Sequence, residues 1–153
     1  MMRSLKLFAL FAAAAMILSS CTVLIVIPDS GIPDGYVSAV EYFDKESFQD
    51  YLDYCKYIYA DSDAVPGQAG LSTVTKQDIV TLAGYFDNFR SWMETCKRLD
   101  EYDFDPTCVD NADWFRIKTE PLVIDDFTDE YADYTIWFFD SQTSTLFYFH
   151  LNI

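Results

Sequence analysis

The spacing of apolar residues predicts two helices in the middle of the chain. The first is expected to begin at Asp44, whose carboxylate can cap free backbone N–H groups, and apolar residues then follow at helical spacing: Phe48, Leu52, Cys55 and Ile58. The second is expected to start after Thr75, with Asp78 near its positive end. Its apolar residues step by three and four positions: Ile79, Leu82, Phe86, Phe89, Met93 and Cys96.

The last third of the chain changes to the period of a strand. Residues 114–119 alternate, and residues 134–139 and 145–151 are rich in aromatic and β-branched residues on either side of the polar loop 140–144. These segments predict one strand followed by a hairpin. The expected fold class is therefore α+β: two helices followed by a three-stranded antiparallel sheet that ends in a C-terminal hairpin. The second helix should lie across one face of this sheet.

The predicted hairpin is apolar at both sets of alternating positions. One set is assigned Ile136, Phe138, Leu146 and Tyr148, and the other Trp137, Phe139, Phe147, Phe149 and Leu151. Because an antiparallel sheet with one wet face should carry polar residues at every second position, both faces must be covered or one must bind something. The first helix is expected to cover the second face. The alternative is an exposed aromatic surface, with candidate binding residues Trp137, Phe139, Phe147 and Phe149.

The N-terminus has a short basic start followed by a long apolar run. Arg3 and Lys6 precede an uncharged apolar run over residues 7–18, which closes with Leu18-Ser19-Ser20-Cys21. This pattern resembles the lipobox of bacterial lipoproteins. The resemblance implies cleavage before Cys21, a diacylglycerol on its sulfur and attachment to the membrane through the acyl chains. The domain would then lie outside the cytoplasm, at the cell membrane or in the cell envelope.

The same region allows an alternative, because the apolar run continues past Cys21 to Ile27. Residues 7–27 could form an uncleaved transmembrane helix, since about 20 apolar residues span a bilayer. Either interpretation places the rest of the chain outside the cytoplasm. The expected organisation is a signal peptide over residues 1–20, the lipidated cysteine and a tether over 21–35, and a single acidic domain over 36–153.

The charge of the chain restricts its partners. The full sequence has 10 basic and 25 acidic residues, a net charge of −15, and removing Arg3 and Lys6 leaves −17 for the remainder. Such a domain is repelled by nucleic acid and by anionic lipid headgroups. We therefore expect no nucleic-acid partner. Besides the membrane, reached through the lipid on Cys21, the expected partner is a basic protein or another envelope component.

Candidate catalytic chemistry is sparse. Cys55, Cys96 and Cys108 are the cysteines beyond Cys21, they form no C-x-x-C motif, and their pairing stays open; in a disulfide, Cys108 is the favoured member because it lies in a loop. His150 is the single histidine, and a structural role at a strand edge is the expectation. No zinc-ligand spacing or glycine-rich phosphate loop is present, so neither a metal nor a cofactor is predicted.

Acidic residues concentrate in two clusters: Asp100, Glu101, Asp103, Asp105, Asp110 and Asp113, then Asp125, Asp126, Asp129, Glu130 and Asp133. Neither contains the glycine that a calcium-binding EF-hand loop needs, so solvated acidic loops are expected. The sequence predicts a membrane-anchored extracytoplasmic lipoprotein with a small non-enzymatic binding domain. The alternatives are a carbohydrate- or peptide-binding module that uses exposed aromatic rings, and a hydrolase that uses a carboxylate pair.

Overall fold

A computed structural model describes residues 31–43, 51–61, 63, 65–120, 122–124, 127–129 and 131–153. All of them fall within the unit Gly31–Ile153. The proposed signal peptide, Cys21 and the predicted helix start at Asp44 and Phe48 lie outside the described residues. No helix formed by the described part of the chain is long and apolar enough to cross a bilayer.

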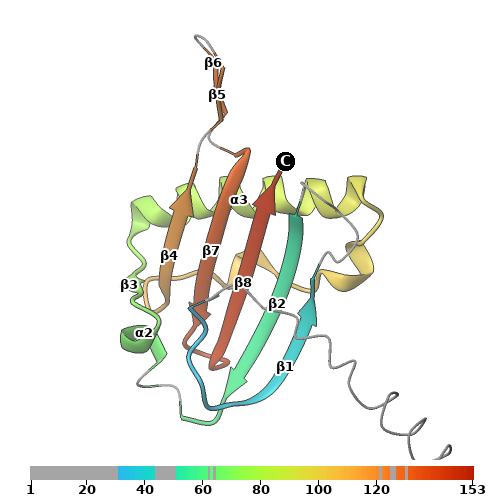
Figure 1. The fold of residues 1–153 in the computed structure, drawn as a ribbon. Coiled ribbons are helices and arrows are strands. Elements are labelled where there is room, and N and C mark those ends of the chain that lie inside the picture. The colour runs from blue at the N-terminus through green and yellow to red at the C-terminus, as the bar shows by residue number, and fades with distance from the viewer. Residues whose placement is uncertain are drawn as a thin grey trace, which may run out of the picture. The chain divides into compact units, whose positions relative to one another are not determined.

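The described unit is built on a six-stranded sheet in which each strand is antiparallel to its neighbours (Figure 1). In their order across the sheet, the strands are β1 (Tyr36–Tyr42), β2 (Tyr51–Tyr59), β8 (Thr145–Asn152), β7 (Asp133–Asp140), β4 (Trp114–Thr119) and β3 (Ser72–Thr73). A separate two-stranded sheet of β5 (Leu122–Ile124) and β6 (Phe127–Asp129) extends beyond the ends of β4 and β7 (Figure 1). The helical elements are α2 (Val65–Gln68), α3 (Lys76–Thr95) and two short 3₁₀ turns, η1 (Leu99–Glu101) and η2 (Pro106–Cys108).

The expected fold of two helices followed by three strands is wrong, because the segment predicted as the first helix forms strand β2. Leu52 and Tyr54 face one side of the sheet, and Cys55 and Tyr57 face the other. Both sides of β2 are buried, so apolar residues occupy nearly every position and satisfy helical and strand spacing together. Because β2 was predicted as a helix, its partner strand β1 was not predicted either; β1 pairs with β2 along its length. The molecule is consequently dominated by its sheet.

Helix α3 begins where its cap residues predict. The Thr75 hydroxyl accepts a hydrogen bond from the Asp78 amide at 3.4 Å, and the Asp78 carboxylate accepts one from the Thr75 amide at 2.9 Å. The helix runs across the strands on one face of the sheet (Figure 1). Its buried residues are Leu82, Tyr85, Phe86, Phe89 and Met93, whereas Cys96 is the exposed C-cap rather than part of the apolar stripe.

The C-terminal hairpin forms the centre of the sheet. Its strands pair from Asp133 opposite Asn152 to Asp140 opposite Thr145. The Asp140 carboxylate closes the turn by accepting hydrogen bonds from the amides of Gln142 and Thr143, at 2.8 and 3.2 Å. Hydrogen bonds within the turn thus stabilise it independently of the packing of the strands.

One apolar layer lies between α3 and the sheet and is centred on Phe149. This ring is fully buried and has its centroid 5.0 Å from Phe86, 5.3 Å from Phe89 and 5.1 Å from Phe104. Offset and edge-on ring pairs of this kind add about 0.5–1.5 kcal/mol each beyond the burial of apolar area. The layer therefore fixes α3 against the middle strands.

A second apolar layer covers the opposite face of the sheet, where the first helix was expected. The sheet side of this layer includes Cys55, Tyr57, Trp137, Phe139, Leu146 and Tyr148. Val65, Ala69 and Leu71, from α2 and the residues after it, pack on these side chains together with Ile32. The Tyr59 hydroxyl also donates to the Pro33 carbonyl at 2.7 Å. Ile32 and Pro33, expected to belong to the tether, thus lie against the sheet.

The buried tyrosines predict a loss of stability at alkaline pH. Burial raises the pKa of Tyr59 to about 12, and burial likewise raises the pKa values of Tyr54, Tyr57, Tyr134 and Tyr148. An unfolded tyrosine ionises near about pH 10, so above that pH the unfolded chain binds fewer protons than the native protein. The contribution of these tyrosines to the free energy of unfolding should be constant below about pH 10 and fall above it.

This prediction is checked by urea unfolding at several pH values with tyrosinate absorbance recorded in parallel. The buried rings should ionise only as the circular dichroism of the sheet is lost. Ionisation of all tyrosines while the sheet signal is intact would contradict the packing described above.

Candidate functional site

The four predicted binding residues do not share one face of the sheet. Trp137 and Phe139 point away from α3, whereas Phe147 and Phe149 belong to the layer beneath α3. Side chains alternate within each strand as predicted. However, Phe147 lies directly opposite Phe138 across the hairpin, so the predicted pairing of the two strands was wrong by one residue. The hairpin therefore does not bring the four rings together.

These rings are also interior side chains. Trp137 is 6% exposed, Phe139 and Phe149 are buried still further, and Phe147 is half-buried against the layer under α3. The guanidinium of Arg116 lies 3.8 Å from the centroid of the Trp137 ring, which adds a cation–π contact to the packing there. The described residues thus leave no open aromatic face on the hairpin for a sugar ring to stack on.

His150 forms a cross-strand pair with Asp53. The two residues are opposite each other on β8 and β2, and His150 Nδ1 lies 3.2 Å from an Asp53 carboxylate oxygen. The Tyr51 ring stacks on the imidazole with centroids 5.8 Å apart. This arrangement joins two neighbouring strands and gives His150 the structural position that the sequence favoured.

The three cysteines among the described residues are free thiols. Burial raises the pKa of Cys55 to about 12. Burial, together with the carboxylates of Asp140 and Asp113, raises the pKa of Cys108 to about 11. Cys96 is exposed at the end of α3. Since the thiolate is the reactive form, Cys55 and Cys108 have the properties of structural cysteines.

Part of the first acidic cluster has a structural role. Asp113 is fully buried, and its carboxylate accepts hydrogen bonds from the amides of Asp110 and Ser141 at 2.9 and 3.0 Å. Burial raises the pKa of this carboxyl group. These bonds connect the turn after β7 to the loop before β4. The expectation of a solvated loop is therefore wrong for Asp113.

The acidic clusters do not form a metal centre in the part of the chain that the structure describes. There, no group of three or more His, Cys, Asp and Glu side chains is arranged to hold a metal ion. In the second cluster, Asp125, Asp126 and Glu130 lie outside the described residues.

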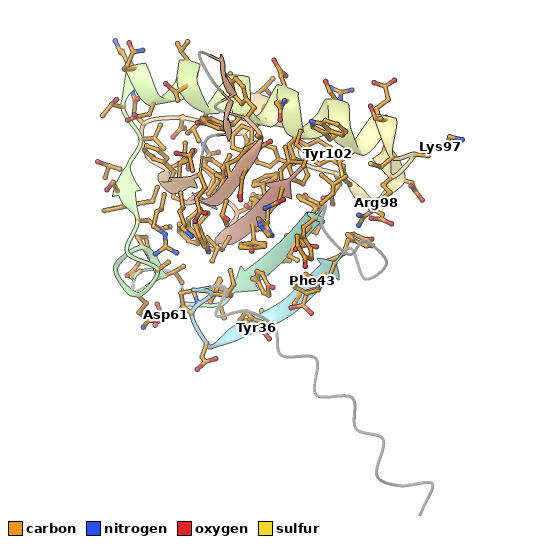
Figure 2. All side chains as sticks on the ribbon, turned by 45° about the horizontal axis from the view of Figure 1, so that its top comes forward. Tyr36, Phe43, Asp61, Lys97, Arg98 and Tyr102 are labelled. Carbon is orange, nitrogen blue, oxygen red and sulfur yellow. The ribbon has the colours of Figure 1, made fainter. Side chains whose placement is uncertain are left out.

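A broad depression of about 390 Å³ lies beside the end of α3 and is lined by Arg90, Leu99, Tyr102, Asp103, Phe104, Asp105 and Pro106. Figure 2 shows Tyr102 and Arg98 in this region. The Tyr102 hydroxyl is buried and has no hydrogen-bond partner among the described residues. The Asp103 carboxylate accepts a hydrogen bond from Tyr54 at 2.6 Å and pairs with Lys56. A lining with one cation and two carboxylates favours no single class of ligand.

The clearest unpartnered surface is the outer edge of β1. This strand is the last of the sheet, and among the described residues only β2 pairs with it. Tyr36 is 43% exposed and Val37 is 65% exposed, and Ile58, which lies opposite Ser38 on β2, is also exposed. These three residues are among the eight large hydrophobic side chains that are exposed in the described structure. Figure 2 shows Tyr36 beside this outer strand.

Side-chain contacts hold β1 in place along its length. At its start, the Tyr36 ring lies 5.1 Å from the Tyr57 ring. Toward its end, the Tyr57 hydroxyl donates to the Glu41 carboxylate at 2.9 Å, and the Arg98 guanidinium donates to the Tyr42 carbonyl at 3.5 Å and also to a carbonyl of β2 at 2.8 Å. The edge is thus an ordered strand, which can bind a partner without first having to fold.

The sequence contains a signal for β1 that the helix prediction overlooked. Residues 36–42 read Tyr-Val-Ser-Ala-Val-Glu-Tyr, which is rich in β-branched and aromatic residues. They follow Gly35, whose φ of +96° provides a turn that other residues rarely adopt. A glycine turn before such a run is a typical start of a strand.

No protein-family model, no curated protein and no solved structure matches this chain. A function for it therefore has to follow from the geometry and chemistry of its own surfaces. Of the surfaces described, the edge of β1 is the one whose groups point to a definite kind of partner.

The environments of the cysteines predict selective alkylation. In the native protein at about pH 8, iodoacetamide should modify Cys96 quickly, because that thiol is exposed. Cys55 and Cys108 should react only after unfolding, since burial keeps them protonated. Peptide mapping by mass spectrometry after short exposures measures this, and a Cys96→Ser variant is the control. Native-state modification of Cys55 at the rate of Cys96 would contradict the position of β2.

Proposed function

We propose that this chain is an extracytoplasmic lipoprotein, anchored through Cys21, whose sheet domain binds a partner protein. The anchor is supported by the sequence around Cys21. The binding role is carried by one structural observation: β1 is an ordered edge strand whose outer side is unpaired among the described residues. The geometry favours interaction over catalysis because the groups best suited to chemistry, such as Asp113 and His150, are engaged in holding strands and turns together.

An open strand edge is a specific kind of binding surface. It presents a row of backbone N–H and C=O groups, to which an extended segment of another protein can add as a further strand. Many proteins protect such edges with lysine, proline or short strands. β1 has seven residues and contains neither lysine nor proline, and Glu41 is its single charged residue. The edge is therefore well suited to accept a partner strand.

One irregularity limits the length of the proposed surface. The pairing of β1 with β2 shifts between Tyr36 and Ser38, so Val37 is an extra residue on the β1 side. Such a bulge twists the edge locally and disrupts regular pairing. Regular pairing runs from Ser38 to Tyr42, and the exposed Val37 side chain stands beside it. The docked segment is therefore expected to be about five residues long, a common strand length.

The proposed anchor would keep this surface close to the membrane. Tyr36 follows Cys21 by 15 positions in the sequence. Even a fully extended chain of that length reaches only about 50 Å. A partner bound at β1 would consequently be held at the envelope, and the acyl chains would concentrate the lipoprotein where such partners occur.

The anchor is tested by replacing the proposed lipidation site. A Cys21→Ser variant should lack both the lipid and the cleavage before residue 21, whereas a Cys96→Ser variant should be cleaved and lipidated like the unaltered chain. Intact-mass measurement of the membrane fraction distinguishes the two. If the unaltered chain carries no lipid and keeps residues 1–20, the segment over residues 7–27 acts as a transmembrane helix and the lipoprotein assignment is wrong.

The edge is tested with two matched surface substitutions in the full chain. Val37 on β1 and Val80 on α3 are similarly exposed, at 65% and 69%. A photoreactive residue placed at Ser38 should form a discrete cross-link with one partner in intact cells. Val37→Lys should reduce this product roughly fivefold or more, because a lysine on the edge opposes strand addition. Val80→Lys should not change it. Equal effects of the two lysines, or no product, would refute the binding role of β1.

A further inference from the structure

The chemistry around β1 also indicates what kind of segment would add to it, if the proposed binding role of this edge is correct. Residues 31–43 contain two acidic side chains, Asp34 and Glu41, and no lysine or arginine. Glu41 is exposed on β1 itself. The edge therefore lies in a negative local field, in addition to the net charge of −15 on the whole chain.

Among the described residues, the basic side chains near the strand do not offset this field, because each is paired with a carboxylate. Lys56, which lies on β2 opposite Val40 of β1, forms an ion pair with Asp103. Arg98, at the end of the strand, forms an ion pair with Glu101 at 2.7 Å. The two pairs are close to neutral, which leaves the carboxylate of Glu41 as the net charge on the strand.

The two sides of the edge differ in character. On the side facing away from α3, the β1 residues are Ala39 and Glu41, which lie opposite Tyr57 and Cys55. On the α3 side, Ser38 lies opposite Ile58, and Val40 comes next on that face. Side chains of an added strand alternate between these two sides. A complementary segment would place basic residues on the side of Glu41 and β-branched residues on the side of Val40.

We infer that the edge of β1 binds an extended segment of a partner protein in which Lys or Arg alternates with β-branched residues. Backbone hydrogen bonds hold the segment as a seventh strand, and cross-strand attraction between its basic residues and Glu41 selects it. A second copy of this chain fits poorly, because its own β1 would bring another Glu41 and another strongly acidic domain to the interface.

The inference is tested with three synthetic peptides and the purified full chain in detergent. The first alternates Lys and Val over about eight residues, within the usual length of a strand. The second replaces every Lys by Glu. The third replaces every Val by Pro, which keeps the positive charge but removes strand pairing. Fluorescence anisotropy of labelled peptides measures binding at low and high salt. The Lys–Val peptide should bind at least about tenfold more tightly than either control, and salt should weaken it.

Two variants locate the binding on the protein. Glu41→Gln removes the charge and keeps an oxygen that can accept the Tyr57 hydrogen bond, so it should weaken Lys–Val binding about threefold to tenfold. Glu94→Gln, an equivalent change at an exposed position of α3, should leave binding unchanged. Equal weakening by the two variants would show a diffuse charge effect and would overturn the inference.

The outcomes separate this inference from the proposed function on which it rests. If the Lys–Val and Glu–Val peptides bind alike and Val37→Lys weakens both, the edge accepts strands but the basic specificity is wrong. If the Lys–Pro peptide binds as well as the Lys–Val peptide and Val37→Lys has no effect, strand addition at β1 is wrong as well. Lack of binding by all three peptides overturns the inference alone, and the cross-link from Ser38 then decides the proposed function.

Discussion

Both faces of the β7–β8 hairpin carry apolar side chains that have to be removed from water. Phe149 and Ile136 on one face require α3, and Trp137 and Leu146 on the other require α2, the residues after it and Ile32. This demand places the hairpin in the middle of the sheet, with β2 on one side and β4 on the other. Helix α3 and the segments on the opposite face therefore cover mainly these central strands. β1 consequently lies at the margin, where most of its side chains are exposed.

The marginal position of β1 does not make it disordered. Its register with β2, the ring contacts of Tyr36 and the bonds from Arg98 fix the strand against the sheet. Arg98 follows α3 directly, so the helix that covers the core also supports the end of the edge. An ordered edge lowers the conformational entropy lost on binding, because only the incoming segment has to be ordered. The core and the proposed binding surface are thereby linked through one side chain.

Helix α3, which has a single buried face, could be predicted from the sequence, whereas strand β2, which is buried on two faces, could not. Helix α3 was predicted from its apolar steps and its cap at Thr75. Strand β2 was mistaken for a helix because residues facing both layers, such as Tyr54 and Cys55, leave no polar face to reveal the period. The sorting of the hairpin residues onto two faces was wrong for another reason: alternation sorts each strand separately, and the pairing of Phe138 with Phe147 depends on the turn. Irregular segments that cover the sheet, such as Ile32 and Pro33, leave no periodic signal in the sequence.

The central claim is that β1 is an ordered strand with one paired and one open side, and hydrogen exchange measures this residue by residue. In an antiparallel edge strand, successive amides point alternately to the neighbouring strand and to solvent. The account predicts alternating slow and fast exchange from Ser38 to Tyr42, with slow exchange throughout the middle of β8. Uniformly slow exchange in β1 would mean that the edge is already covered. Uniformly fast exchange would mean that no ordered edge exists, and either result would contradict the account.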